Sequence, residues 1–202
     1  ADRKAGEPIE VVSISRIEPK KGLTHLVEAI AQLKQKGVTV KAHIVGSKDP
    51  HSQGSLEYAA AFEALIEKLG VQDLVILHGM KKQEELPPIL QRCRAFVAPY
   101  VEMGSGDKDG IPTAMLEGLA SGLPVVTTDS GSILEVVTTE VEGIVVPQRD
   151  SQAFAKALLR LIEDGVGSAF FHGLSLGASL RFTGPMGFFV NELAHTGDAV
   201  YV

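Results

Sequence analysis

The stretch IEVVSISRIEPKKGLTHLVEAIAQLKQKG, residues 9–37, joins an apolar run, a basic turn and a segment of helical period. Residues 9–15 are mostly apolar and β-branched, which predicts a buried strand. From residue 22 the apolar side chains recur on one helical face, at Leu23, Leu26, Val27, Ile30 and Leu33. Gly37 is expected to end this helix. The stretch therefore predicts the first strand–turn–helix unit of an α/β fold.

Apolar runs and helical segments continue to alternate along the chain. Further strands are predicted at residues 38–46, 74–79, 95–99, 124–128 and 143–147, and further helices at 55–70, 83–93, 112–122 and 151–165. The strands are apolar throughout rather than at every second residue, which indicates a parallel sheet covered on both faces. We therefore expect one Rossmann-like, doubly wound α/β domain of about six strands over residues 1–164. Ligands of such sheets bind beyond the carboxyl ends of the strands, where the strand order reverses.

Residues 165–202 depart from this pattern. They are rich in Gly and Phe, contain Arg181 as their single Lys or Arg, and keep neither helical nor strand period for long. We treat them as an atypical tail of unknown role, and expect the domain to be complete by about Asp164.

Composition excludes several classes of protein. The 202 residues are 45% hydrophobic, which suits one globular domain with a sizeable core. A net charge of −6 argues against binding to nucleic acid, which requires clustered Lys and Arg. Cys93 is the single cysteine and is expected to be a buried free thiol. No apolar run approaches the roughly 20 residues that span a bilayer, so we expect a cytoplasmic protein without a membrane span.

The basic turn at residues 15–22, SRIEPKKG, follows the first strand and opens the first helix. A helix amino terminus offers unpaired N–H groups and a partial positive charge, and Arg16 and Lys21 add two cations there. This combination favours a phosphate site. A solvated basic turn is the alternative, and neither a P-loop nor a G-x-G-x-x-G fingerprint is present.

Two acids frame the start of the helix predicted from about Pro112 to Ser121. Asp109 lies just before it and Glu117 lies within it. Two carboxylates at this spacing can accept hydrogen bonds from the hydroxyl pairs of a sugar and a ribose. The alternative is that Asp109 is an ordinary cap and Glu117 a surface acid.

Two other chemistries use paired acids. A glycoside hydrolase would need the two carboxylates but would have no use for Arg16 and Lys21. Asp107 and Asp109 also match the D-x-D metal site of GT-A glycosyltransferases, yet acid pairs are common in loops. The six His residues are scattered without zinc spacing, so we expect no metal and no cofactor.

Four separated blocks carry a family resemblance: RIEPKKG, DGIPTAMLEGLASGLPVV, SGSILEVV and EGIVVP. Over residues 9–164 the chain resembles the carboxy-terminal, donor-binding domain of the GT-B retaining glycosyltransferases of family 4, the glycosyl transferases group 1. The resemblance implies transfer of a sugar from a nucleotide-diphosphate sugar to an acceptor such as a polysaccharide, lipid or glycan precursor.

The resemblance also implies roles for residues. Arg16 and Lys21 would hold the diphosphate, Asp109 would orient the sugar, and these three form the expected catalytic set. Glu117 would hold the ribose hydroxyls, and Met80 would lie beside the base. The backbone that follows Asp109 would contact the sugar and the distal phosphate. This segment consists of Gly110, Ile111, Pro112 and Thr113.

Three departures from the family pattern stand out. Ser15 replaces the usual Gly, and Asp109 is one methylene shorter than the usual Glu. No counterpart of the family's amino-terminal, acceptor-binding domain is present in this sequence, so we expect half an enzyme that is inactive without that partner domain. The alternative is a noncatalytic nucleotide-sugar-binding module or a truncated remnant.

Overall fold

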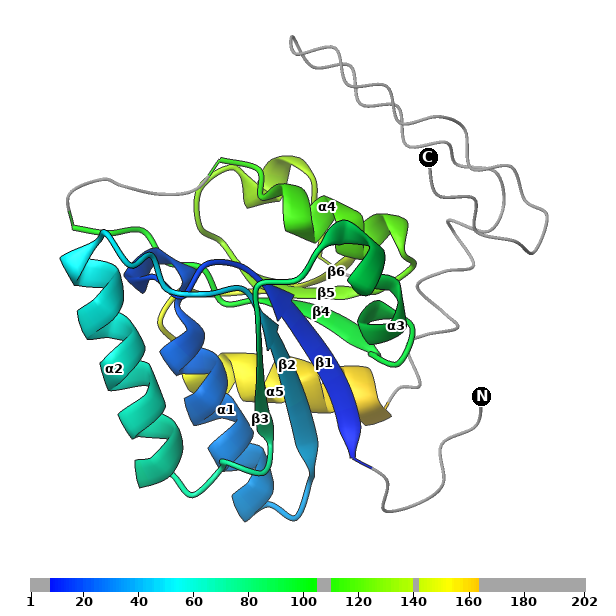
Figure 1. Cartoon of the computed structure of the whole chain (residues 1–202). Helices are drawn as coiled ribbons and strands as arrows, with labels where there is room; N and C mark the ends of the chain where they lie inside the picture. Colours follow the sequence, from blue (N-terminus) through cyan, green and yellow to red (C-terminus); the bar gives the residue numbers. More distant parts are fainter. Residues whose placement is uncertain (1–7, 105–109, 140–141, 164–202) are drawn as a thin grey trace, which may run out of the picture.

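The predicted six-stranded parallel sheet is confirmed. The computed structural model describes residues 8–104, 110–139 and 142–163, of which 162 and 163 are described for the backbone alone. The strands are β1 (Ile9–Ile14), β2 (Val40–Val45), β3 (Val75–Gly79), β4 (Ala95–Ala98), β5 (Val125–Thr128) and β6 (Gly143–Val146). They pair in parallel in the order β3-β2-β1-β4-β5-β6 (Figure 1).

Helices cover both faces of this sheet. They are α1 (Leu23–Gln35), α2 (Gln53–Lys68), α3 (Pro87–Leu90), α4 (Thr113–Ala120) and α5 (Ser151–Glu163). One face packs against α1, α2 and α5, and the other against α3 and α4 (Figure 1). The architecture is therefore the doubly wound, Rossmann-like arrangement that the alternating sequence pattern predicts.

The first helix forms for the reasons visible in its sequence. All five apolar residues predicted on its buried face are fully buried. The chain then turns at Gly37, whose φ of +76° lies in the left-handed region that glycine adopts without a steric penalty. The helix ends at Gln35, two residues before the predicted end at Gly37.

One helix prediction needs correction, and another is confirmed. The helix expected over residues 83–93 is a 3-10 turn at Gln83–Glu85 followed by the single turn α3, because Pro87 and Pro88 lack N–H groups and disfavour helix before them. The helix expected from about Pro112 to Ser121 is confirmed as α4, Thr113–Ala120, with Pro112 as its extended N-cap. The tail at residues 165–202 lies outside the described residues, so its boundary stays a prediction.

The strand order reverses between β1 and β4. The chain leaves β1 towards β2 on one side and returns through α3 to β4 on the other, so loops from both halves of the sheet diverge at this point. A crevice is expected there, at the carboxyl ends of the strands.

Candidate functional site

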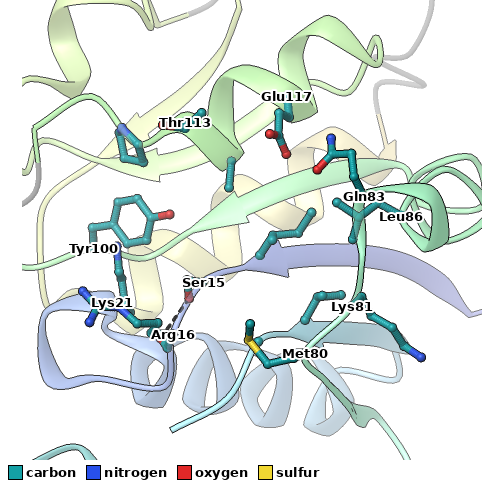
Figure 2. A pocket seen from close by; sticks show the side chains of 15 residues that line it. Ser15, Arg16, Lys21, Met80, Lys81, Gln83, Leu86, Tyr100, Thr113 and Glu117 are labelled. Atoms are coloured by element: carbon teal, nitrogen blue, oxygen red, sulfur yellow. Dashed lines mark hydrogen bonds between the residues drawn. The ribbon is translucent and has the colours of Figure 1, made fainter. Parts of the chain in front are cut away.

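A cleft of about 360 Å³ lies at this reversal of strand order. We call it the switch-point cleft (Figure 2). It is lined by Ile14, Ser15, Arg16, Lys21, Val45, Gly46, Met80, Lys81, Gln83, Leu86, Tyr100, Pro112, Thr113, Ala114 and Glu117. These residues come from the ends of β1, β2, β3 and β4 and from the start of α4, so five separate segments meet at one opening.

The basic turn is fixed against the end of β2. The backbone N–H of Ser15 donates to the Val45 carbonyl at 2.9 Å, and that of Ile17 donates to the Ser47 carbonyl at 3.0 Å. Gly46 lies between these bonds with φ +132°, and a Cβ there would be 2.0 Å from the Ser15 carbonyl oxygen. Close backbone contact therefore holds the turn at the cleft, and it depends on glycine at position 46.

Arg16 contributes a cation that is already paired. Its guanidinium binds the Glu18 carboxylate at 2.8 Å, and its side chain is 58% exposed. The Ser15 hydroxyl donates to the Arg16 carbonyl at 3.2 Å (Figure 2). The Glu18 side chain is only 13% exposed, so the pair is half-buried and an anion that binds Arg16 would share it with Glu18.

Lys21 is the second cation of the basic turn and lies at its carboxyl end. It belongs to the 3-10 turn Pro19–Lys21, which Gly22 closes in the left-handed conformation. The Lys21 ammonium lies 4.6 Å from the centre of the Tyr100 ring, within the range of a cation–π contact. Tyr100 follows β4 and is 1% exposed.

The helix α4 forms the opposite wall. Gly118 lets this helix approach β4 closely, since a Cβ at that position would lie 2.6 Å from the Phe96 ring. Thr113 and Glu117 both line the switch-point cleft. In Figure 2, Glu117 and Thr113 lie on one side of the opening and Arg16 and Lys21 on the other.

Most of the site residues predicted from the sequence meet at this cleft. Arg16, Lys21, Met80, Pro112, Thr113 and Glu117 line it. Gly110 and Ile111 are described but are not part of the lining, and Ile111 is 38% exposed. Asp109 lies outside the described residues, so its distance from Glu117 is not defined.

The lining residues that sequence reasoning missed include Lys81, Gln83, Leu86 and Tyr100. The first three follow Met80 in the same loop, so the prediction for Met80 could have been extended to them. Tyr100 gives no local signal, because it reaches the cleft through the pairing of β4 beside β1.

A second polar group is formed by Glu10, His43 and His78 on β1, β2 and β3 together with Arg92 from the segment before β4. We call these four residues the sheet-face cluster. His43 Nδ1 and His78 Nε2 are 2.8 Å apart, and the two rings stack. The Glu10 carboxylate lies 3.4 Å from His43 Nε2 and 2.9 Å from Arg92 Nε. The contacts therefore run from His78 through His43 and Glu10 to Arg92, and none of these residues lines the switch-point cleft.

Burial governs ionisation around this cluster. Burial lowers the pKa of both His43 and His78, while Glu10 raises that of His43 and the neighbouring Arg92 lowers both. Lys81 further lowers the pKa of His78. Burial also raises the pKa of the nearby Cys93 thiol to about 12, so the predicted buried thiol is confirmed.

Metal sites and membrane spans are both absent from the described residues 8–104, 110–139 and 142–163. These residues contain no group of three or more His, Cys, Asp or Glu that could hold a metal ion. Within the same ranges, every helix is too short or too polar to cross a bilayer. The D-x-D pair at Asp107 and Asp109 lies outside them.

Comparison with known proteins identifies relatives. Amylovoran biosynthesis glycosyltransferase AmsK from Erwinia amylovora is 37% identical over 155 residues, covering 77% of this chain and 36% of that protein. Putative colanic acid biosynthesis glycosyltransferase WcaL from Escherichia coli (strain K12) is 34% identical over 151 residues, covering 75% of this chain and 35% of that protein. The chain thus spans little more than a third of the length of these relatives.

A solved structure agrees with the fold. The crystal structure of Anabaena Alr3699/HepE in complex with UDP and glucose matches with a TM-score of 0.69 and 24% identity. The match covers 81% of this chain and 41% of that chain. Residues 1–169 of this chain also match the family described as Glycosyl transferases group 1. Because one family accounts for most of its length, the chain belongs to the glycosyl transferases group 1 family.

Proposed function

We propose that this chain is the carboxy-terminal, donor-binding half of a family 4 glycosyltransferase that retains the configuration of the transferred sugar. The observation that carries the proposal is the switch-point cleft, which combines two cations on one wall with a carboxylate on the other. Relatives named as colanic acid and amylovoran biosynthesis glycosyltransferases support an acceptor in polysaccharide biosynthesis, such as a polysaccharide, lipid or glycan precursor.

The cationic wall would hold the diphosphate of the donor. Arg16 supplies a planar fork that matches phosphate oxygens, and Lys21 supplies a compact charge. As the glycosidic bond breaks, the departing diphosphate gains negative charge. Cations fixed before the reaction stabilise that charge more in the transition state than in the ground state.

The opposite wall would hold hydroxyl groups. Glu117 would accept hydrogen bonds from the ribose, and the segment from Gly110 to Thr113 would address the sugar and the distal phosphate. Asp109 would orient the sugar, a role that rests on the family resemblance. Met80, which is 73% exposed at the rim, would lie beside the base.

The proposal includes no metal and no cofactor, since Arg16 and Lys21 would supply the positive charge that the leaving group requires. An amino-terminal domain would supply the acceptor site and exclude water, so we expect no sugar transfer by this chain alone. The compartment that we propose is the cytoplasm.

A panel of nucleotide sugars tests the donor proposal. Each compound is added to the 202-residue chain and the melting temperature is recorded. A specific ligand at 100 times its dissociation constant stabilises the chain by about 2.7 kcal/mol, so one base and one sugar should raise the melting temperature clearly above the others. The matching nucleosides serve as controls. No shift with any nucleoside diphosphate or nucleotide sugar would contradict donor binding.

A further inference from the structure

The family resemblance assigns a role to Lys21 but none to Tyr100, whose ring contacts the Lys21 ammonium. We propose that Tyr100 is a positioning residue, whose ring holds the Lys21 ammonium in place to bind the diphosphate. This inference rests on the proposed donor function and adds to it a residue on a different strand.

The ring lies at the right place for this role. The Lys21 ammonium lies 4.6 Å from the ring centre, and both residues line the switch-point cleft (Figure 2). Lysine carries a flexible four-carbon stem, and ordering it on binding costs conformational entropy. A ring that already holds the ammonium removes part of that cost before the ligand arrives.

The backbone holds both partners in register. The Val101 N–H donates to the Lys20 carbonyl at 2.9 Å, which ties the segment after β4 to the basic turn. Gly22 packs against the Pro99 carbonyl so closely that a Cβ would lie 1.9 Å from its oxygen. The residues flanking Lys21 therefore contact the residues flanking Tyr100 on both sides.

The third attachment comes from β5. The Thr128 hydroxyl donates a hydrogen bond to the Tyr100 carbonyl, and the Thr127 hydroxyl donates to the Ala98 carbonyl at 2.9 Å. Both threonines are buried. The backbone around Tyr100 is thus anchored to β5 and to the basic turn, and with 1% exposure its ring has little freedom to move.

The test separates a ring that positions Lys21 from a ring that only fills space. Binding of a nucleoside diphosphate and of its nucleoside is measured for the whole chain, the Tyr100→Phe variant and the Tyr100→Leu variant. The phenylalanine variant keeps the aromatic face and should bind like the parent. The leucine variant should weaken diphosphate binding about three- to thirty-fold, the range of a cation–π contact, and leave nucleoside binding unchanged.

A double-mutant cycle with Lys21→Ala completes the test. If the ring acts through Lys21, Tyr100→Leu has no further effect on diphosphate binding once Lys21 is gone. Equal loss in both backgrounds, or equal loss for the nucleoside, would overturn the proposal. If Tyr100→Leu fails to fold, fluorinated phenylalanines at position 100 replace it. Diphosphate affinity should then fall as fluorination weakens the ring face, and a flat series would overturn the proposal.

The experiment distinguishes failure of the Tyr100 proposal from failure of the donor proposal. If diphosphate affinity falls in Lys21→Ala but not in Tyr100→Leu, only the role of Tyr100 is contradicted. Absence of diphosphate binding by the parent chain contradicts both.

Discussion

The switch-point cleft and the sheet-face cluster contain similar kinds of residue in different arrangements. Arg16, Lys21 and Glu117 border an open volume of about 360 Å³. The acid, the arginine and the two histidines of the sheet-face cluster instead contact one another at 2.8 to 3.4 Å. Charged groups that border an open volume can bind a ligand, whereas groups whose contacts are mainly with one another act mainly on the stability of the fold.

From this difference we expect substitutions in the two regions to affect different properties, ligand binding in one and stability in the other. Substitutions of the charged cleft residues Arg16, Lys21 and Glu117 should reduce binding and leave stability nearly unchanged. Substitutions in the sheet-face cluster should change stability and leave binding nearly unchanged. A charged residue of either group that changed both would break the comparison.

The largest effect is expected at Gly46, which joins the two regions because it follows the strand that carries His43. Gly46→Ala should destabilise the chain by about 3 kcal/mol or more, since the new Cβ would overlap the Ser15 carbonyl in a backbone conformation that strains alanine. Urea unfolding measures this.

The matched control is Gly37→Ala. Gly37 also has a positive φ, but nothing lies within 4 Å of its Cβ position. Only the backbone strain remains, and the expected cost is about 1 kcal/mol. Equal losses of unfolding free energy in Gly46→Ala and Gly37→Ala would show that the contact between Gly46 and the Ser15 carbonyl does not hold the basic turn in place.

The next effect tests the acidic wall of the cleft. Glu117→Gln should weaken binding of a ribonucleoside diphosphate by about 1.5–3 kcal/mol, because the ribose hydroxyls would lose a charged acceptor. Binding of the 2′,3′-dideoxy analogue should hardly change. Isothermal titration measures both.

Glu84→Gln is the control, since Glu84 is an exposed acid of the neighbouring loop that does not line the cleft. If Glu117→Gln leaves the ratio of the affinities for the ribonucleotide and the dideoxynucleotide unchanged, Glu117 does not bind the ribose and is an ordinary surface acid.

The smallest effect is a pH dependence of stability from the sheet-face cluster. The pKa values of His43 and His78 are lowered in the folded chain, so the unfolded chain binds more protons once the pH falls below about 6.5. Their neutral forms therefore favour folding above that pH, and this stability is lost as the pH falls towards the folded pKa values. Glu10, Arg92 and Lys81 are the charged groups that modulate the effect.

Melting temperatures between pH 8 and pH 5 measure this loss. His78→Gln should reduce it, while His51→Gln, which removes an exposed imidazole outside the cluster, should not. A loss of equal size in parent and His78→Gln would show that the histidine pair does not control acid stability.

The sequence predicted the fold better than the site. All six strands were found because their Val and Ile runs are local signals, and α1 was found because its apolar face repeats. Arg16 and Lys21 were found because they follow β1 directly. Tyr100 and the pairing of His43 with His78 were missed, since these contacts join segments far apart in the chain and depend on strand order and register.

The central claim is that the cationic wall of the switch-point cleft binds a diphosphate. Calorimetric titration of the parent, Arg16→Ala and Lys21→Ala with a nucleoside diphosphate and the matching nucleoside tests it most directly. Each substitution should weaken diphosphate binding by about 1.5–3 kcal/mol, because charged hydrogen bonds are lost, and leave nucleoside affinity and melting temperature unchanged. Diphosphate affinity that is unaffected by both substitutions, or an equal loss for the nucleoside, would contradict the account.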